Sequence, residues 1–284
     1  MTITYDDVKK AQETQSEIIR KTSLEFSETF SKICGANVFL KNEYEQKTGS
    51  FKIRGAYYKI KSLTDEQKSK GVVAASAGNH SQGVAFASNI ENIPCTIVMP
   101  RTASPAKVAA TKSYGAKVVL EGSTYDESWD HAQKISAETN ATVIHAFDDS
   151  NVIAGQGVIG LEIMEELPDV DEIYVPIGGG GLVAGIITAV KEKHPHVKII
   201  GVESSAYPAM KKSLENNSLE TVSGDTTIAD GISVKTPGKL TFDIVREKID
   251  KIVTVDDKDI INAMFLLMER SKAVVEPAGA VALA

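Results

Sequence analysis

The stretch EIYVPIGGGGLVAGIITAVKEK, residues 172–193, changes its pattern at four consecutive glycines. Before the glycines, Glu172–Ile177 is a short, continuous apolar run, which is typical of a strand buried on both faces. After them, Leu182–Lys193 has apolar residues at helical spacing. A strand, a glycine loop and a helix in this order predict one strand–helix unit of a parallel sheet.

The same alternation of short apolar runs and longer helical patterns continues along almost the whole chain. Further strands are expected at Asn37–Lys41, Gly71–Ala75, Cys95–Met99, Lys117–Leu120, Thr142–His145, Lys198–Val202 and Ile252–Val255. Further helices are expected at Val8–Thr22, Phe51–Ser62, His80–Asn89, Lys107–Tyr114, Asp126–Thr139, Val152–Glu166 and Asp259–Arg270. This pattern predicts an α/β fold with two parallel sheets and helices on both faces of each. Strands before Lys52 and after Asn151 are expected to share the second sheet.

The four βα units from Gly71 to His145 predict a small domain inserted in a larger one. The small domain is residues 71–148, and the large domain combines residues 1–70 and 149–284. In folds of this kind, ligands bind at the carboxyl ends of strands, in the crevice between layers.

Composition and charge exclude several classes of protein. The 284 residues carry 31 Lys plus Arg and 38 Asp plus Glu, a net charge of −7. Without a basic run, a nucleic-acid partner is not expected. The longest uncharged stretch, residues 173–190, contains Pro176 and the four glycines, so a membrane span is not expected either. The polar, acidic amino-terminal stretch has no signal-peptide pattern, so we expect a cytoplasmic protein.

The loop Gly178, Gly179, Gly180, Gly181 and Leu182 predicts a phosphate site. Without Cβ atoms, the backbone N–H groups can converge on an anion, and the helix dipole favours negative charge there. A tight turn would need only one glycine. The run Gly179-x-Gly181-x-x-Ala184 also fits a relaxed dinucleotide fingerprint, with Glu203 where a ribose-binding acid belongs. From this loop alone, NAD and a simple phosphate cofactor both remain open.

Two further loops carry candidate chemistry. Ser76-Ala77-Gly78-Asn79-His80 lies between a strand and a helix, and it predicts a second anion site of carboxylate size. Asn79 either reaches a ligand there or caps the helix, and both interpretations stay open. In Thr48–Ala56, Lys52 lies in the first turn of a helix, at the positive end of the helix dipole. This position predicts a lowered pKa, which suits a lysine that forms a Schiff base.

Thr48–Ala56, Ser76–His80 and Gly178–Leu182 together resemble the pyridoxal-phosphate β-family (fold type II), and within it threonine dehydratase and serine racemase. Asp148–Gly157 and Thr227–Gly231 are similar to further stretches of that subgroup. The resemblance implies pyridoxal 5'-phosphate as the cofactor.

The resemblance also implies roles for single residues. Lys52 would carry the cofactor, Phe51 would pack near its ring, and Asn79 would bind its phenolic oxygen. The loop of Ser76, Ala77, Gly78, Asn79 and His80 would receive the substrate carboxylate. The glycine loop Gly178–Leu182 would hold the phosphate. The freed amine of Lys52 would remove the Cα proton of the amino acid.

The reaction implied is the dehydration of L-threonine to 2-oxobutanoate and ammonia, with L-serine giving pyruvate and ammonia. Racemase members carry a serine where this chain has Ala77, and a methyl group cannot return a proton, so dehydration is favoured. Serine racemase stays an alternative, as do an NAD-dependent oxidoreductase and a non-catalytic phosphate-binding module. The resemblance further implies a homo-oligomer, a dimer or tetramer. The stretch Glu276–Ala280 is similar to the corresponding stretch of biosynthetic-type dehydratases, which act in isoleucine biosynthesis.

Two departures from the family pattern give further expectations. Glu203 matches a metal ligand of racemase-like members, but Ala209 stands where a second carboxylate would be, so no metal is expected. The chain stops at Ala284 within a helical pattern, before the family's next strand, whose Ser or Cys faces the pyridine nitrogen. We expect a chain extended through that strand to be more stable and more active.

Overall fold

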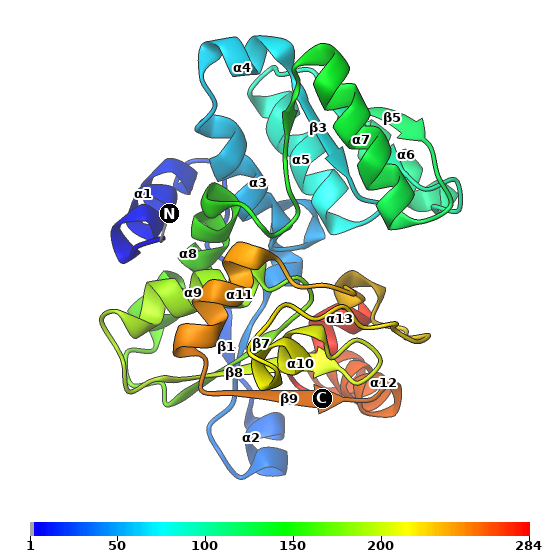
Figure 1. Ribbon diagram of the computed structural model, residues 1–284. Helices are drawn as coiled ribbons and strands as arrows, with labels where there is room; N and C mark the ends of the chain where they lie inside the picture. The colour runs from blue at the N-terminus through cyan, green and yellow to red at the C-terminus, as the bar shows by residue number, and fades with distance from the viewer. Residues whose placement is uncertain (1–2) are drawn as a thin grey trace.

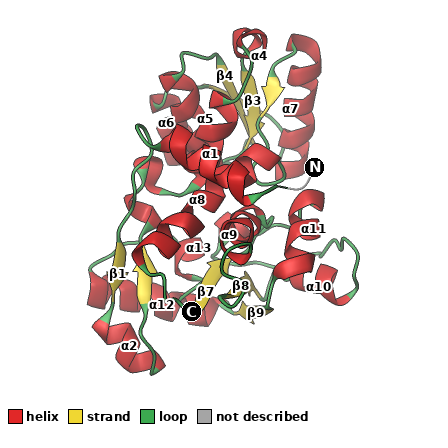
Figure 2. Cartoon of the chain, turned by 90° about the vertical axis from the view of Figure 1, so that its left-hand side faces the viewer, coloured by secondary structure: helices red, strands yellow, loops and turns green. Residues whose placement is uncertain are grey.

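The computed structural model describes residues 3–284, in which two parallel sheets and one two-stranded antiparallel sheet are packed among helices (Figures 1 and 2). The four-stranded parallel sheet has the order β5-β4-β3-β6, and the three-stranded one has the order β7-β8-β9. The strands of the first are β3 (Val72–Ala75), β4 (Cys95–Met99), β5 (Lys117–Leu120) and β6 (Thr142–Val143). Those of the second are β7 (Glu172–Pro176), β8 (Lys198–Ser204) and β9 (Lys251–Val255). The predicted α/β class with two parallel sheets is therefore confirmed.

The four-stranded sheet is covered on both faces. Its helices are α3 (Lys52–Lys61), α4 (Asp65–Lys70), α5 (Asn79–Ile90), α6 (Pro105–Ser113) and α7 (Tyr125–Thr139). Val72 and Ala74 pack with α3 and α5, whereas Val73 and Ala75 pack with α7. Because side chains alternate along a strand, a run that is apolar at every position must be covered on two sides.

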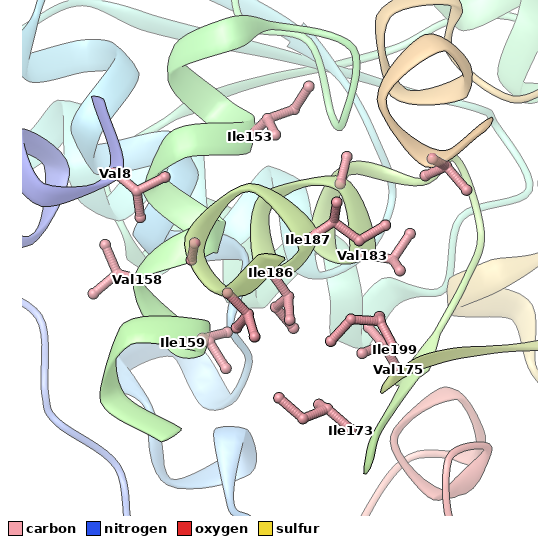
Figure 3. Packing of buried hydrophobic residues seen from close by; sticks show 14 of the residues in the cluster. Val8, Ile153, Val158, Ile159, Ile173, Val175, Val183, Ile186, Ile187 and Ile199 are labelled. Carbon is pink, nitrogen blue, oxygen red and sulfur yellow. The ribbon is translucent and has the colours of Figure 1, made fainter. Parts of the chain in front are cut away.

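The three-stranded sheet also has an apolar layer on each face. Figure 3 shows Ile173, Val175 and Ile199 packed against side chains of α8 and α9. On the other face, Val202 packs with α12 and with Phe30 of α2. The helices of this half are α1 (Tyr5–Gln15), α2 (Glu28–Cys34), α8 (Ser150–Glu166), α9 (Gly181–Lys191), α10 (Ala209–Glu215), α11 (Lys239–Lys248), α12 (Asp257–Leu266) and α13 (Pro277–Ala280).

One predicted strand pairs differently from our expectation. The run Asn37–Lys41 forms β2 (Phe39–Lys41), which pairs antiparallel with β1 (Leu24–Phe26) and not with the second parallel sheet. The chain reverses through α2, which ends at Gly35 in the left-handed conformation, so the two strands return side by side. The predicted helix Val8–Thr22 ends at Gln15.

The division into a small domain of residues 71–148 and a large domain of the remainder stays a prediction. Helix α3 precedes Gly71 in the chain, yet it contacts α5 of the first sheet as well as α8. No helix within residues 3–284 has both the length and the apolar character needed to cross a membrane.

A buried ion network joins α3 to α8. The fully buried Arg54 places its guanidinium nitrogens 2.7 and 2.9 Å from the carboxylate of Glu162, and Nε and Nη2 each 2.8 Å from Glu43. Lys41 lies 2.8 Å from Glu162. Burial alone would lower the pKa of Arg54, but the two carboxylates raise it above its ordinary value. Arg54 therefore stays charged and fixes the helix that begins with Lys52.

Candidate active site

Lys52 is the first residue of α3, and its amine is turned into the protein. Its Nζ donates a hydrogen bond of 2.9 Å to the carbonyl oxygen of Ala146, and it lies 5.4 Å from the centre of the Phe51 ring. Burial lowers the pKa of Lys52 to about 8, a change that Glu276 partly opposes. The predicted lowering of the pKa is confirmed, but burial of the amine is its main cause.

The turn that leads into α3 is strained and contains unsatisfied hydroxyls. Thr48 and Gly49 both have positive φ, +69° and +74°, and this conformation is costly for a threonine. Among residues 3–284, the buried hydroxyls of Thr48 and Ser50 have no hydrogen-bond partner. Strain and unpaired polar atoms gathered next to Lys52 mark this turn as a candidate functional site.

The Ser76–His80 loop follows β3 and leads into α5. Gly78 is the N-cap residue and its N–H donates to the hydroxyl of Ser76, while Asn79 is the first residue of the helix. The Asn79 side chain makes no capping hydrogen bond, so the capping interpretation is wrong. Its amide nitrogen instead donates to Glu276 at 2.6 Å. An amide nitrogen carries two hydrogens, so one remains free to donate to a ligand.

His80 is buried and stays neutral. Burial, with a further contribution from Lys52, lowers the pKa of His80 to about 3. Its Nε2 lies 2.9 Å from the carbonyl oxygen of Ile144, so Nε2 carries the proton and Nδ1 is an acceptor. That Nδ1 is buried with no partner in the described part of the chain.

The glycine loop presents a row of free donors at the start of α9. Gly180 is the N-cap residue with φ +94°, and the helix begins at Gly181. The backbone N–H groups of residues 178–183 donate to no acceptor within residues 3–284, although neighbouring Ile177 and Ala184 both do. Unpaired N–H groups at a helix amino terminus can bind anions, so these free donors are consistent with the phosphate site predicted for this loop, which stays a prediction.

Residues 144–148, which follow β6, bring the three loops together. The carbonyl of Ile144 binds His80, the carbonyl of Ala146 binds Lys52, and Phe147 packs against the glycine loop. The N–H groups of Phe147 and Asp148 donate to Nδ1 of His145, which fixes this segment. This segment has no chemical motif of its own in the sequence, and its place after a parallel strand is the one local signal for its role.

These residues fit pyridoxal phosphate. The row of N–H groups suits its phosphate, the buried Lys52 suits its aldehyde, and the free hydrogen of Asn79 suits a ring oxygen. A family model described as "Pyridoxal-phosphate dependent enzyme" matches residues 15–284. The chain belongs to this family. Pyridoxal phosphate is thus the cofactor, and the NAD interpretation of the glycine loop is wrong.

Several members of the pyridoxal-phosphate family are close to this chain in sequence or structure. L-threonine ammonia-lyase of Thermotoga maritima is 50% identical over 282 residues, which are 99% of this chain and 70% of that protein. The structure of processed threonine deaminase isoform 2 from Solanum lycopersicum has a TM-score of 0.93 at 38% identity, covering 98% of this chain and 82% of the other. The structure of serine racemase from Dictyostelium discoideum has a TM-score of 0.94 at 36% identity, covering 100% of this chain and 91% of the other.

Glu203, which matches a ribose-binding acid and a metal ligand by its sequence position, makes hydrogen bonds to the protein backbone. It is buried at the end of β8, and its two oxygens accept hydrogen bonds from the N–H groups of Met210 and Lys211 at 2.8 and 2.9 Å. Burial raises the pKa of Glu203 to about 7. Its carboxylate therefore holds the start of α10 in place.

We expect Gly179→Ala to weaken cofactor binding. A Cβ at this position would overlap the Phe147 ring, so the ring or the loop must shift. Overpacking of this kind costs about 1–3 kcal/mol, so we expect affinity for pyridoxal phosphate to fall about fivefold or more. Equilibrium dialysis measures the change. Gly279→Ala is the control, because a Cβ there meets no atom closer than 3.7 Å. Equal affinity of Gly179→Ala and the parent would contradict this account of the loop.

Proposed function

We propose that this protein is a threonine ammonia-lyase, which converts L-threonine to 2-oxobutanoate and ammonia, and L-serine to pyruvate and ammonia. The observation that carries the proposal is the position of the buried Lys52 amine. The amine contacts the segment of residues 144–148, which His80 and the glycine loop also contact. The 50% identity to an enzyme named L-threonine ammonia-lyase supports this choice of reaction.

Lys52 is proposed to hold the cofactor and to move the Cα proton of the substrate. With a pKa of about 8 rather than 10.5, the amine can release its proton near neutral pH, which proton transfer requires. Pyridoxal phosphate supplies the electron sink that stabilises negative charge at Cα. The carbonyl of Ala146 orients the amine when Lys52 is free.

The remaining site residues are proposed to bind and orient. Ser76, Ala77, Gly78, Asn79 and His80 form the loop that receives the substrate carboxylate. Asn79, held by Glu276, would direct its second amide hydrogen to the phenolic oxygen of the cofactor. Gly178, Gly179, Gly180, Gly181 and Leu182 would bind the phosphate, and Phe51 would pack near the ring. His80, being neutral, adds no positive charge beside Lys52.

The proposed reaction is tested by product analysis. The protein, saturated with pyridoxal phosphate, is incubated with L-threonine, and 2-oxobutanoate and ammonia are measured separately. We expect the two products in equal amounts, and pyruvate with ammonia from L-serine. D-serine formed from L-serine without a 2-oxo acid would instead support the racemase alternative. Absence of any 2-oxo acid would contradict the proposal.

We expect Ala77→Ser to introduce measurable racemisation of L-serine. The loop that holds Ala77 lies on the carboxyl side of β3, between the strand and α5. By the resemblance to the racemases, a hydroxyl there would supply a second group that can exchange a proton with the substrate, in addition to Lys52. Chiral chromatography of L-serine incubated with each protein measures D-serine. Ready formation of D-serine by the parent would show that Ala77 does not decide between the two reactions.

We further propose a homo-oligomer, a dimer or tetramer, that acts in the cytoplasm. Several large apolar side chains of α2 and of the region from α12 onward are about half exposed or more, namely Ile33, Ile261, Phe265 and Met268. A second copy of the chain would cover such side chains. Analytical ultracentrifugation is expected to give twice or four times the chain mass of 30.5 kDa. Sedimentation as a monomer at micromolar concentration would contradict the oligomer.

A further inference from the structure

Thr241, in the first turn of α11, is bound to the glycine loop. Its side chain is fully buried, and its hydroxyl lies 2.6 Å from the carbonyl oxygen of Gly179 and 3.0 Å from that of Gly238. The N–H of Gly238 donates to the same Gly179 oxygen at 3.2 Å. Two donors from one helix start thus converge on a single carbonyl of the loop.

Holding this carbonyl fixes the direction of the next N–H group. The peptide bonds of residues 3–284 are all trans, so the Gly179 carbonyl and the Gly180 N–H point in opposite directions. With the oxygen turned toward Thr241, the Gly180 N–H points away from α11. Glycine residues can adopt both signs of φ, so a run of four glycines does not by itself select this orientation of the peptide.

Asp148 holds the start of α11 against the loop. Its carboxylate accepts hydrogen bonds from the N–H groups of Lys239, Leu240 and Thr241 at 2.9–3.1 Å. Asp148 belongs to the same segment, residues 144–148, whose Ala146 carbonyl binds Lys52. The position of Thr241 is therefore fixed relative to both the glycine loop and Lys52.

We infer that Thr241 is a positioning residue for the phosphate cradle: its hydroxyl selects the one orientation of the Gly179–Gly180 peptide that directs the Gly180 N–H toward the phosphate. The inference rests on the proposed role of Gly178–Leu182 in phosphate binding. It predicts that loss of the hydroxyl weakens binding through the phosphate and leaves the contacts of the pyridine ring unchanged.

The test compares pyridoxal phosphate with pyridoxal, which lacks the phosphate. Thr241→Val replaces the hydroxyl with a methyl group of similar size, and Thr241→Ser keeps the hydroxyl. Thr188→Val is the matched control, because Thr188 is a buried threonine of α9 whose hydroxyl binds the Ala184 carbonyl within the helix and does not touch the loop. Dissociation constants for both ligands are measured by equilibrium dialysis, and thermal melts establish that each variant is folded.

We expect Thr241→Val to bind pyridoxal phosphate about five- to tenfold more weakly, the size of one lost hydrogen bond, and to bind pyridoxal as the parent does. Thr241→Ser and Thr188→Val should match the parent with both ligands. Should Thr241→Val not fold, Thr241→Ala removes the same hydroxyl without adding a branched methyl, and the same selective loss is expected.

Equal weakening toward the two ligands, or unchanged binding of pyridoxal phosphate by Thr241→Val, would overturn the role of Thr241 alone. A parent protein that binds both ligands with the same affinity would instead overturn the assignment of Gly178–Leu182 as the phosphate cradle, and with it this inference. The parent's own preference thus separates a failure of the proposed function from a failure of the inference.

Discussion

Lys52→Ala is expected to lower kcat with L-threonine by at least about a thousandfold, because Lys52 supplies both the covalent attachment of the cofactor and the proton transfer. The thermal stability of the variant should stay close to that of the parent. Within residues 3–284 the amine makes one hydrogen bond, to the Ala146 carbonyl, and its lowered pKa shows that burial disfavours its charged form. A coupled assay of 2-oxobutanoate and a thermal melt of the same sample measure the two effects.

Lys61→Ala is the matched control for this change. Lys61 is the last residue of the same helix, α3, and its amine binds Glu91 at the surface. We expect this variant to keep the parent's kcat. A Lys52→Ala protein that retains more than about a tenth of the parent's kcat would contradict the assignment, since that loss corresponds to only about 1.4 kcal/mol.

Arg54→Leu is expected to lower the free energy of unfolding by about 3–5 kcal/mol, because it leaves the carboxylates of Glu43 and Glu162 without their buried cation. Lys41 remains beside Glu162, and its ion pairs within residues 3–284 are with Glu162 and Glu166 and not with Glu43. The loss should also disturb the junction of α3 with α8, and therefore the placement of Lys52. Urea denaturation followed by circular dichroism measures the change.

Arg101→Leu tests whether burial is the cause of the loss. Arg101 lies 2.8 Å from Glu121, a distance similar to those around Arg54, but both side chains are exposed. An exposed ion pair contributes only about 0–1 kcal/mol, so the free energy of unfolding of this variant should be close to that of the parent. Equal losses in the two variants would show that the buried network of Arg54 has no special contribution.

The central strands of the parallel sheets could be predicted from the sequence because they are buried on both faces. The nearly apolar run Cys95–Met99 forms such a strand at the predicted bounds. The edge strand Lys117–Leu120 also has the predicted bounds, although its two end residues are exposed. The pairing of Phe39–Lys41 with Leu24–Phe26 could not be predicted in this way. Each strand has three residues, too few for a periodic pattern, and the reversal between them depends on α2.

The separate loops of the site were predicted because each has a local signal. Four consecutive glycines, a lysine at a helix start and a small-residue loop after a strand each limit the chemistry on their own. The long-range contacts of these loops have no local signal. Glu276 lies 197 residues from Asn79 along the chain, and Thr241 lies 62 residues from Gly179, so these contacts arise only from tertiary packing.

The predictions for Asn79 and Lys52 were limited in the same way, because local sequence patterns do not show tertiary packing. The helix start at Asn79 left capping and ligand binding both open, and the structure excludes capping by Asn79 because Gly78 is the N-cap residue. The position of Lys52 at a helix start led to the correct direction of its pKa shift, but burial causes most of that shift. Burial depends on the whole fold, so a local pattern cannot measure it.

The central claim is that Lys52 carries pyridoxal phosphate in a threonine ammonia-lyase, and mapping the attachment site tests it most directly. The protein is saturated with pyridoxal phosphate, reduced with borohydride, digested and examined by mass spectrometry. We predict that the reduced cofactor is found on the peptide that contains Lys52, and that L-threonine added before reduction lowers this labelling. Label on another lysine while Lys52 stays unmodified, or labelling that L-threonine does not change, would contradict the account.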